Sequence, residues 1–158
     1  MSLFITIMEY NWKLKNFDEL TNRELYRILK LRTEVFVLEQ ACLYPELDDK
    51  DYVCLHLWAE KDGKIVAYTR LVPAGISYPQ ASIGRVIVVK EARGTGLSQL
   101  LMQKSIAAIL EAFGPQDIQI GAQFHLKSFY EKLGFEQNSE PYPDYGILHI
   151  DMTKSVLK

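Results

Sequence analysis

The chain contains 158 residues, of which 48% are hydrophobic and 24% are charged, the balance of an ordinary globular domain with one core. Eighteen basic and twenty acidic residues leave a formal net charge of −2 at pH 7, so the basic excess typical of nucleic-acid-binding proteins is absent. No apolar run approaches the roughly 18 residues that cross a bilayer. We therefore expect one domain with no nucleic-acid or membrane partner.

The first seven residues, Met1–Ile7, are apolar but lack a basic leader and are followed too soon by an acidic residue for a secretory signal. We interpret them as an extension that precedes a natural start at Met8, and we expect the domain to span residues 8–158. Cys42 and Cys54 lack C-x-x-C spacing, which predicts free thiols in a reducing cytoplasm.

The first elements in chain order are a strand and a helix. Tyr10–Leu14 alternates between apolar and polar residues and is typical of a short strand. Residues 21–24 (TNRE) form a capping box, in which the threonine and glutamate side chains bond each other's backbone amides. Apolar residues at helical spacing from Leu25 to Phe36 predict the helix that follows, with Arg32 near one edge of its apolar face.

A hairpin and a buried strand come next. The runs Cys54–Glu60 and Lys64–Val72 flank Asp62-Gly63, a dipeptide typical of tight hairpin turns. Ser82–Val89 is dense in valine and isoleucine, so we expect a central strand buried on both faces.

The remaining elements alternate between helix and strand. Apolar positions from Leu101 to Phe113 predict an amphipathic helix closed by Gly114-Pro115. Ile118–Ala122 is a short strand, a helical stripe from Leu126 to Leu133 stops at Gly134, and Ile147–Thr153 is a last strand. This order predicts one α/β sheet with an antiparallel first half.

The loop Arg93–Ser98 between the central strand and the next helix is the most informative segment. Its glycines let the backbone approach a ligand, and the helix that follows offers free amides and the positive end of its dipole. Pyrophosphate fits such a site; a tight turn without a ligand is the alternative. Gln99 stands where a Rossmann loop has its third glycine, and the Walker Gly-Lys-Ser/Thr is missing.

The pattern Arg93-x-x-Gly96-x-Ser98 resembles the acetyl-CoA loop of the GNAT N-acetyltransferase superfamily, Gln/Arg-x-x-Gly-x-Gly/Ala, with serine in place of the last small residue. Downstream, Gln123-x-x-Leu126-x-x-x-Tyr130 is similar to the second motif of that family, Asn-x-x-Ala-x-x-x-Tyr, and the family's Gly-Phe follows it. Glutamine and leucine depart from the second motif, whereas the tyrosine matches it.

Further segments resemble the ElaA-like branch of the superfamily and cover nearly all of the chain after Met8. They are Leu31–Gln40, His56, Ala67–Arg70, Ile83–Val88, Gly121–Gln123 and His149-Ile150. The branch itself implies no particular acceptor.

The resemblance implies a single-domain GNAT fold, a mixed central sheet flanked by helices. It implies transfer of an acetyl group from acetyl-CoA to a primary amine, on a small molecule, a peptide or a protein, by direct attack and without a metal. The residues expected to bind the cofactor are Val86, Ile87, Val88, Arg93, Gly94, Thr95, Gly96, Leu97, Ser98, Gln123 and Tyr130.

Direct attack requires a neutral amine, a group that stabilises the oxyanion and a proton for the leaving thiolate. The resemblance assigns the oxyanion to a backbone amide of Val86–Val88. Tyr130, with an unperturbed pKa of about 10, suits the acid; a tyrosine that only packs in its helix is the alternative.

The base is open, because Ser82–Val89 carries no carboxylate. His125 has an unperturbed pKa near 6.5, about right for a proton acceptor at neutral pH, and Glu39 is a second candidate. Their alternative roles are a histidine bonded to backbone and an acid paired in a salt bridge.

Arg32, Arg70 and Arg85 are spaced so that some should face inward, where a guanidinium needs a carboxylate. Two roles are open for these arginines: they bind a substrate carboxylate, or they pair with Glu34 or Glu39 inside the protein. The acidic residues that follow the first helix attract a cationic amine or form a solvated surface. They are Glu46, Asp48, Asp49 and Asp51.

Two alternative functions are compatible with the same fold. A non-catalytic module that binds or senses acyl-CoA would keep the pocket without the chemistry, and a protein-interaction domain would have lost CoA altogether. The spacing of Cys42, Cys54, His56 and His149 supports no metal site.

Overall fold

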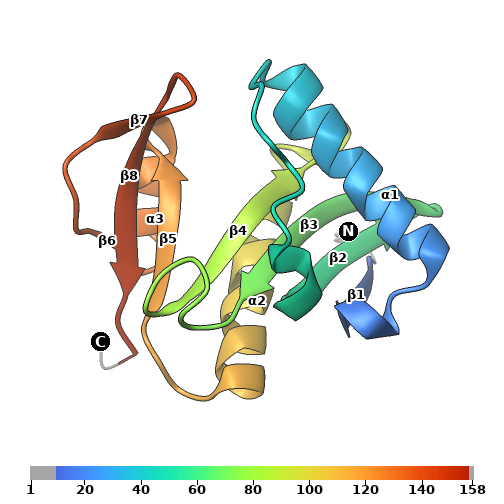
Figure 1. The fold of residues 1–158 in the computed structure, drawn as a ribbon, viewed down its shortest axis with the longest axis horizontal. Coiled ribbons are helices and arrows are strands. Elements are labelled where there is room, and N and C mark those ends of the chain that lie inside the picture. The colour runs from blue at the N-terminus through green and yellow to red at the C-terminus, as the bar shows by residue number, and fades with distance from the viewer. Residues whose placement is uncertain (1–9, 157–158) are drawn as a thin grey trace, which may run out of the picture.

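The computed structural model describes residues 10–156. It contains one mixed sheet in the order β1-β2-β3-β4-β5-β8-β6, with β7 paired to β8 (Figure 1). The extension expected at Met1–Ile7 lies outside the described residues. The strands are β1 Asn11–Asn16, β2 Leu55–Lys61, β3 Lys64–Val72, β4 Ala81–Val88, β5 Ile118–Gln123, β6 Glu136–Gln137, β7 Tyr142–Asp144 and β8 Ile147–Lys154.

Three α-helices cover the sheet: α1 Asn22–Arg32, α2 Leu97–Phe113 and α3 Lys127–Glu131. One core cluster packs Leu101 of α2 and Tyr130 of α3 against one face of the sheet, and a second packs Ile28 of α1 against the other face. The expected α/β architecture with an antiparallel first half is confirmed, because β1 to β4 pair antiparallel and β4 pairs parallel with β5. No helix of the described chain is long and apolar enough to cross a membrane.

Local sequence signals account for the first half of the fold. Thr21 Oγ1 accepts the Glu24 backbone amide at 3.1 Å and the Glu24 carboxylate accepts that of Thr21 at 2.9 Å, so the capping box starts α1 as predicted. Asp62 and Gly63 both have positive φ, as a tight hairpin turn requires. The helix predicted through Phe36 changes its hydrogen-bond pattern after α1 and continues as a π-helical segment, Thr33–Glu39.

The central strand β4 carries two irregularities that shape the molecule. In the described chain, two residue pairs join it to β5, Ala81 with Ile118 and Ser82 with Gln119. Beyond them the strands diverge, as Figure 1 shows. On the other edge, the register against β3 shifts at a β-bulge, where Arg85 takes a positive φ of 52°, a conformation that is strained for a bulky side chain.

Candidate active site

A cleft of about 840 Å³ lies where β4 and β5 diverge. Its walls come from both strands, from α3, from residues 35–50 and from the β7–β8 hairpin. The rings of Tyr44 and Tyr145 meet across it, with centroids 5.2 Å apart. The divergence of two strands therefore produces a site that elements from both halves of the chain surround.

The predicted anion loop lies at one end of this cleft. Gly94 and Gly96 have φ of 77° and 83°, and a Cβ built at either would meet no heavy atom within 4 Å. Gly96 begins α2, and no side chain of the described residues caps that helix. The first amides of α2 are therefore open to a ligand, which fits a pyrophosphate group. Arg93 and Ser98 also line the cleft.

The loop is held in place by its own side chains. Arg93 Nε donates to the Val88 carbonyl at 2.9 Å, and Thr95 Oγ1 donates to the Ala92 carbonyl at 2.6 Å. Leu97 is buried and anchors the start of α2 in the core. These contacts fix the strand-to-helix turn from within the protein.

Among residues 10–156, no strand pairs with the edge of β4 that faces β5 beyond Ser82. Val86, Ile87 and Val88 line the cleft there. Backbone groups on such an edge can pair with an extended ligand as with an added strand. The roles expected for this edge, binding of a pantetheine arm and stabilisation of an oxyanion by its amides, stay a prediction.

Tyr130 of α3 lines the same cleft and is 6% exposed. Its ring packs edge-on against Phe129 and Phe135, at centroid distances of 5.1 and 6.1 Å. Its hydroxyl has no hydrogen-bond partner among residues 10–156. Burial raises the pKa of Tyr130 to about 12, so the phenol is protonated at neutral pH.

The base candidates occupy different environments within the cleft. His125 is exposed and follows β5 directly. Glu39 accepts a hydrogen bond from Arg93 at 3.1 Å and lies 4.0 Å from Lys90, which leaves its carboxylate paired. Gln123 lies beside them and donates to Gln40 at 3.3 Å.

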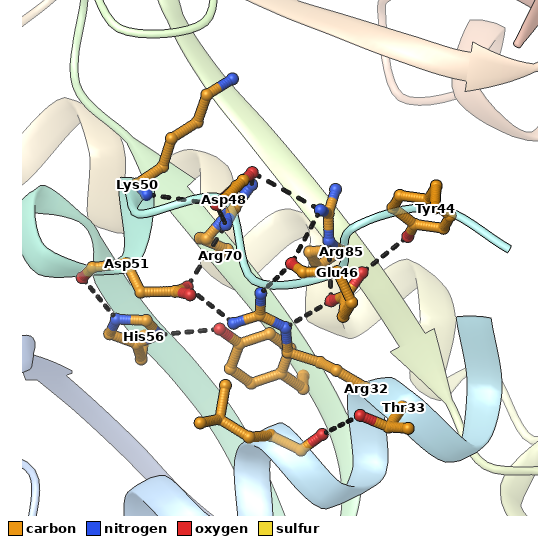
Figure 2. Close-up of polar contacts among 12 residues, drawn as sticks. Arg32, Thr33, Tyr44, Glu46, Asp48, Lys50, Asp51, His56, Arg70 and Arg85 are labelled. Carbon is orange, nitrogen blue, oxygen red and sulfur yellow. Dashed lines mark hydrogen bonds and ion pairs between the residues drawn. The ribbon is translucent and has the colours of Figure 1, made fainter. Parts of the chain in front are cut away.

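The partners expected for the inward-facing arginines are wrong. Arg32 is completely buried and donates to Glu46 at 2.7 Å and to Asp51 at 2.6 Å (Figure 2). Glu34, one of the two expected partners, lies instead 4.0 Å from Lys30, and Glu39 pairs with Arg93. Because no part of Arg32 reaches solvent, its expected contact with a substrate is also wrong.

The solvated surface expected for the acidic residues is wrong for Glu46, Asp48 and Asp51, whereas Asp49 is exposed as expected. Glu46 and Asp51 are only 6% and 7% exposed, because arginines compensate their charges. Asp48 receives both terminal nitrogens of Arg70 at 2.8 Å. Burial alone would raise the pKa of Asp48, but the hydrogen bonds and charge of Arg70 outweigh it and lower that pKa to about 2. The carboxylates are structural counterions.

Arg85 completes this network from the β4 bulge. Its Nε donates to Glu46 at 2.9 Å, and its guanidinium lies 5.4 Å from the Tyr44 ring centroid and 6.0 Å from that of Phe36. Arg70 and Arg85 line the cleft, so their contact with an acceptor stays a prediction. We call Arg32, Arg70, Arg85, Glu46, Asp48 and Asp51 the arginine cluster.

His56 and Cys54 are buried outside the cleft wall, whereas Cys42 and His149 line the cleft. His56 is buried between the Tyr68 hydroxyl at 2.7 Å and the Asp51 carbonyl at 3.2 Å, and burial lowers its pKa. Cys42 and Cys54 are free thiols. Residues 10–156 contain no group of three or more side chains placed to hold a metal ion.

One polar cluster at the cleft escaped the sequence analysis. The hydroxyls of Tyr142 and Tyr78 donate to the same oxygen of Asp151, at 2.7 and 3.3 Å. Both rings line the cleft beside Gly121. Alternation along the last strand could have put Asp151 on a polar face, but no local signal connects it to two distant tyrosines. We call Tyr78, Tyr142 and Asp151 the tyrosine–aspartate cluster.

A family model described as an acetyltransferase (GNAT) domain matches residues 18–156. The chain belongs to the GNAT acetyltransferase family. A UPF0039 protein of Synechocystis is 40% identical over 92% of this chain and 95% of its own length. The crystal structure of ElaA from Escherichia coli is similar with a TM-score of 0.88 at 34% identity, over 93% of this chain and all of that one.

A crystal structure of an acyl-CoA N-acyltransferase from Pseudomonas aeruginosa is similar with a TM-score of 0.89 and 39% identity, over 93% of this chain and 100% of that chain. The GNAT fold and the ElaA-like branch expected from the sequence are thus confirmed. The chain is an acyltransferase of the GNAT family, and acyl-CoA is the donor that this family uses.

Proposed function

We propose that the protein transfers an acetyl group from acetyl-CoA to a primary amine, carried by a small molecule, a peptide or a protein. The divergence of β4 from β5 carries this proposal, because it brings a free strand edge, an uncapped helix start and Tyr130 around one cleft. The free cysteines agree with a cytoplasmic location.

The reaction requires few groups. The amine nitrogen attacks the thioester carbonyl and forms the C–N bond, a β4 amide stabilises the resulting oxyanion, and the C–S bond breaks when this intermediate collapses. The amine's proton passes to a base, and the leaving thiolate takes a proton from Tyr130. His125 has a free ring at the cleft, whereas Glu39 would first have to leave Arg93.

The test is release of free CoA thiol from acetyl-CoA in the presence of a panel of primary amines, with the acetylated product identified by mass spectrometry. Tyr130→Phe should lower kcat by roughly 10²–10⁴-fold, the usual contribution of a general acid, and change the Kd of CoA by less than about tenfold. Tyr26→Phe, at an exposed position of α1, is the matched control. Unchanged turnover in Tyr130→Phe, with chemistry limiting, would remove the phenol from the mechanism.

The donor site is tested separately by Gly96→Glu. A side chain there is strained by the positive φ and brings a negative charge into the open space at the start of α2, so CoA binding should be lost in a folded variant. A non-catalytic binding module would bind CoA without releasing thiol, and a protein-interaction domain would not bind CoA. Calorimetry with CoA distinguishes these outcomes.

The base is identified from the pH dependence of kcat/KM. His125→Ala or Glu39→Ala should remove the limb of the profile that reports the base, while CoA still binds. If both variants keep the wild-type profile, neither side chain is the base.

A further inference from the structure

The carboxylate of the tyrosine–aspartate cluster differs from the carboxylates of the arginine cluster in its partners. Glu46, Asp48 and Asp51 each contact at least one arginine within 3.3 Å. Within residues 10–156, Asp151 has no cation at ion-pair distance; its partners are two phenols and the Ser139 hydroxyl, which accepts its backbone amide at 2.8 Å. Asp151 is therefore a half-buried carboxylate without a counterion.

The cluster also leaves hydrogen-bond acceptors unused. Each phenol gives its only hydrogen to Oδ1 of Asp151, so its oxygen can offer only lone pairs to a ligand. The other oxygen of Asp151 has no partner among the described residues. Burial and the nearby carboxylate raise the pKa of Tyr78 to about 12 and raise that of Tyr142 as well, so both phenols stay protonated and keep donating to Asp151.

These oxygens converge on one place. A Cβ built at Gly121 would lie 2.9 Å from the Tyr78 hydroxyl, 3.4 Å from the Tyr142 hydroxyl and 3.9 Å from Oδ1 of Asp151. Gly121 sits on β5 opposite Asp151 and lines the cleft between the diverged strands. The two phenols thus pack over Gly121 and line the reaction cleft, with Asp151 bonded to both of their hydroxyls.

We propose that Tyr78, Tyr142 and Asp151 form the subsite that binds the ammonium group of the acceptor. A primary ammonium has three N–H donors and one positive charge, and the cluster offers two phenol oxygens at the cleft and the negative charge of the carboxylate that holds them. A quaternary ammonium has the charge without the donors, and an alcohol has a donor without the charge. The subsite therefore selects primary amines in their charged form.

This inference rests on the proposed function, in which the acceptor is an amine. The subsite concentrates the acceptor as the ammonium ion. One proton leaves to a base such as His125, and from there to solvent, before the nitrogen attacks, and the second leaves to the base after the C–N bond has formed. The charge of Asp151 makes the amine easier to bind, and the base makes it reactive.

The experiment titrates the ¹⁵N-labelled full chain with n-butylammonium at pH 7 and constant ionic strength, following the backbone amides of Gly121 and Asp151. We expect saturable shifts with n-butylammonium and none with n-butyltrimethylammonium or n-butanol. Tyr142→Phe should raise the Kd about tenfold or more, because it removes a hydrogen bond to a charged group. Tyr78→Phe is the second variant in case the first does not fold, and Tyr26→Phe is the control that should keep the wild-type Kd.

Equal shifts with n-butyltrimethylammonium, or an unchanged Kd in a folded Tyr142→Phe or Tyr78→Phe variant, would overturn the subsite. Transfer from acetyl-CoA to n-butylamine is measured on the same samples. Binding without transfer would count against the proposed function and leave the subsite standing. Transfer without saturable shifts would overturn the subsite and leave the function standing.

Discussion

The two polar clusters of the cleft use similar groups for different purposes. In the arginine cluster, three guanidiniums face three carboxylates and the charges balance (Figure 2). In the tyrosine–aspartate cluster, one carboxylate is held by two neutral phenols. A balanced buried network leaves no charge for a ligand, whereas an unpaired charge beside a cleft is available to one. Charge balance, rather than the presence of charged residues, therefore separates the framework of this site from its binding groups.

In the arginine cluster, Arg32→Leu should cause the largest loss of stability. It leaves Glu46 and Asp51 buried with less compensation, and breaking a buried pair in this way typically costs about 3–5 kcal/mol of unfolding free energy. Denaturant unfolding measures the loss. Lys30→Leu is the control on the same helix, because its side chain is 66% exposed and its ion pair with Glu34 is 4.0 Å long; it should change stability by less than about 0.5 kcal/mol. Equal losses of unfolding free energy in Arg32→Leu and Lys30→Leu would show that the arginine cluster does not stabilise the fold.

Low pH should also reduce the stability that the arginine cluster contributes. The pKa of Asp48 is lowered from 3.8 in its ordinary state to about 2 in the folded protein, so the unfolded chain binds protons first as pH falls. The stabilisation is complete above about pH 5 and disappears as pH falls toward 2. Asp48→Asn should remove about 1–2 kcal/mol of this pH-dependent stability, after allowance for solvent screening. Urea unfolding at several pH values measures it, and a slope identical to wild type would contradict the assignment.

In the tyrosine–aspartate cluster, removal of the charge should affect ligand binding rather than stability. Asp151→Asn leaves no cation unpaired, and the amide oxygen can still accept from a phenol, so unfolding free energy should change by less than about 1 kcal/mol. Binding of n-butylammonium should nevertheless be lost. A loss of stability as large as that of Arg32→Leu would show that Asp151 belongs to the framework instead.

The smallest effect separates the two phenols within the cluster. The hydroxyl of Tyr142 donates over 2.7 Å and that of Tyr78 over 3.3 Å, so Tyr142→Phe should cost about 1 kcal/mol of unfolding free energy and Tyr78→Phe about 0.5 kcal/mol. Thermal unfolding of the two folded variants measures the difference. The reverse order would place the stronger bond at Tyr78.

Structural features that depend on residues close together in the chain could be predicted from the sequence. The capping box at Thr21, the turn at Asp62-Gly63 and the glycine loop before α2 are local patterns, and each forms as expected. The partners of Arg32 are not local, because the irregular segment after the first helix carries no periodicity that shows which carboxylates fold back. The cluster around Asp151 combines a loop and two strands, so only the folded chain brings it together.

The divergence of β4 from β5 has a consequence for the amount of folded protein in a cell. Backbone groups that a continuous sheet would pair internally are left for an extended ligand, so an acyl-CoA that binds there acts as a missing strand. A ligand that binds only the native state adds to its stability by mass action, about 2.7 kcal/mol at one hundred times its Kd. The lifetime of this protein against unfolding and proteolysis should therefore rise and fall with the acyl-CoA supply.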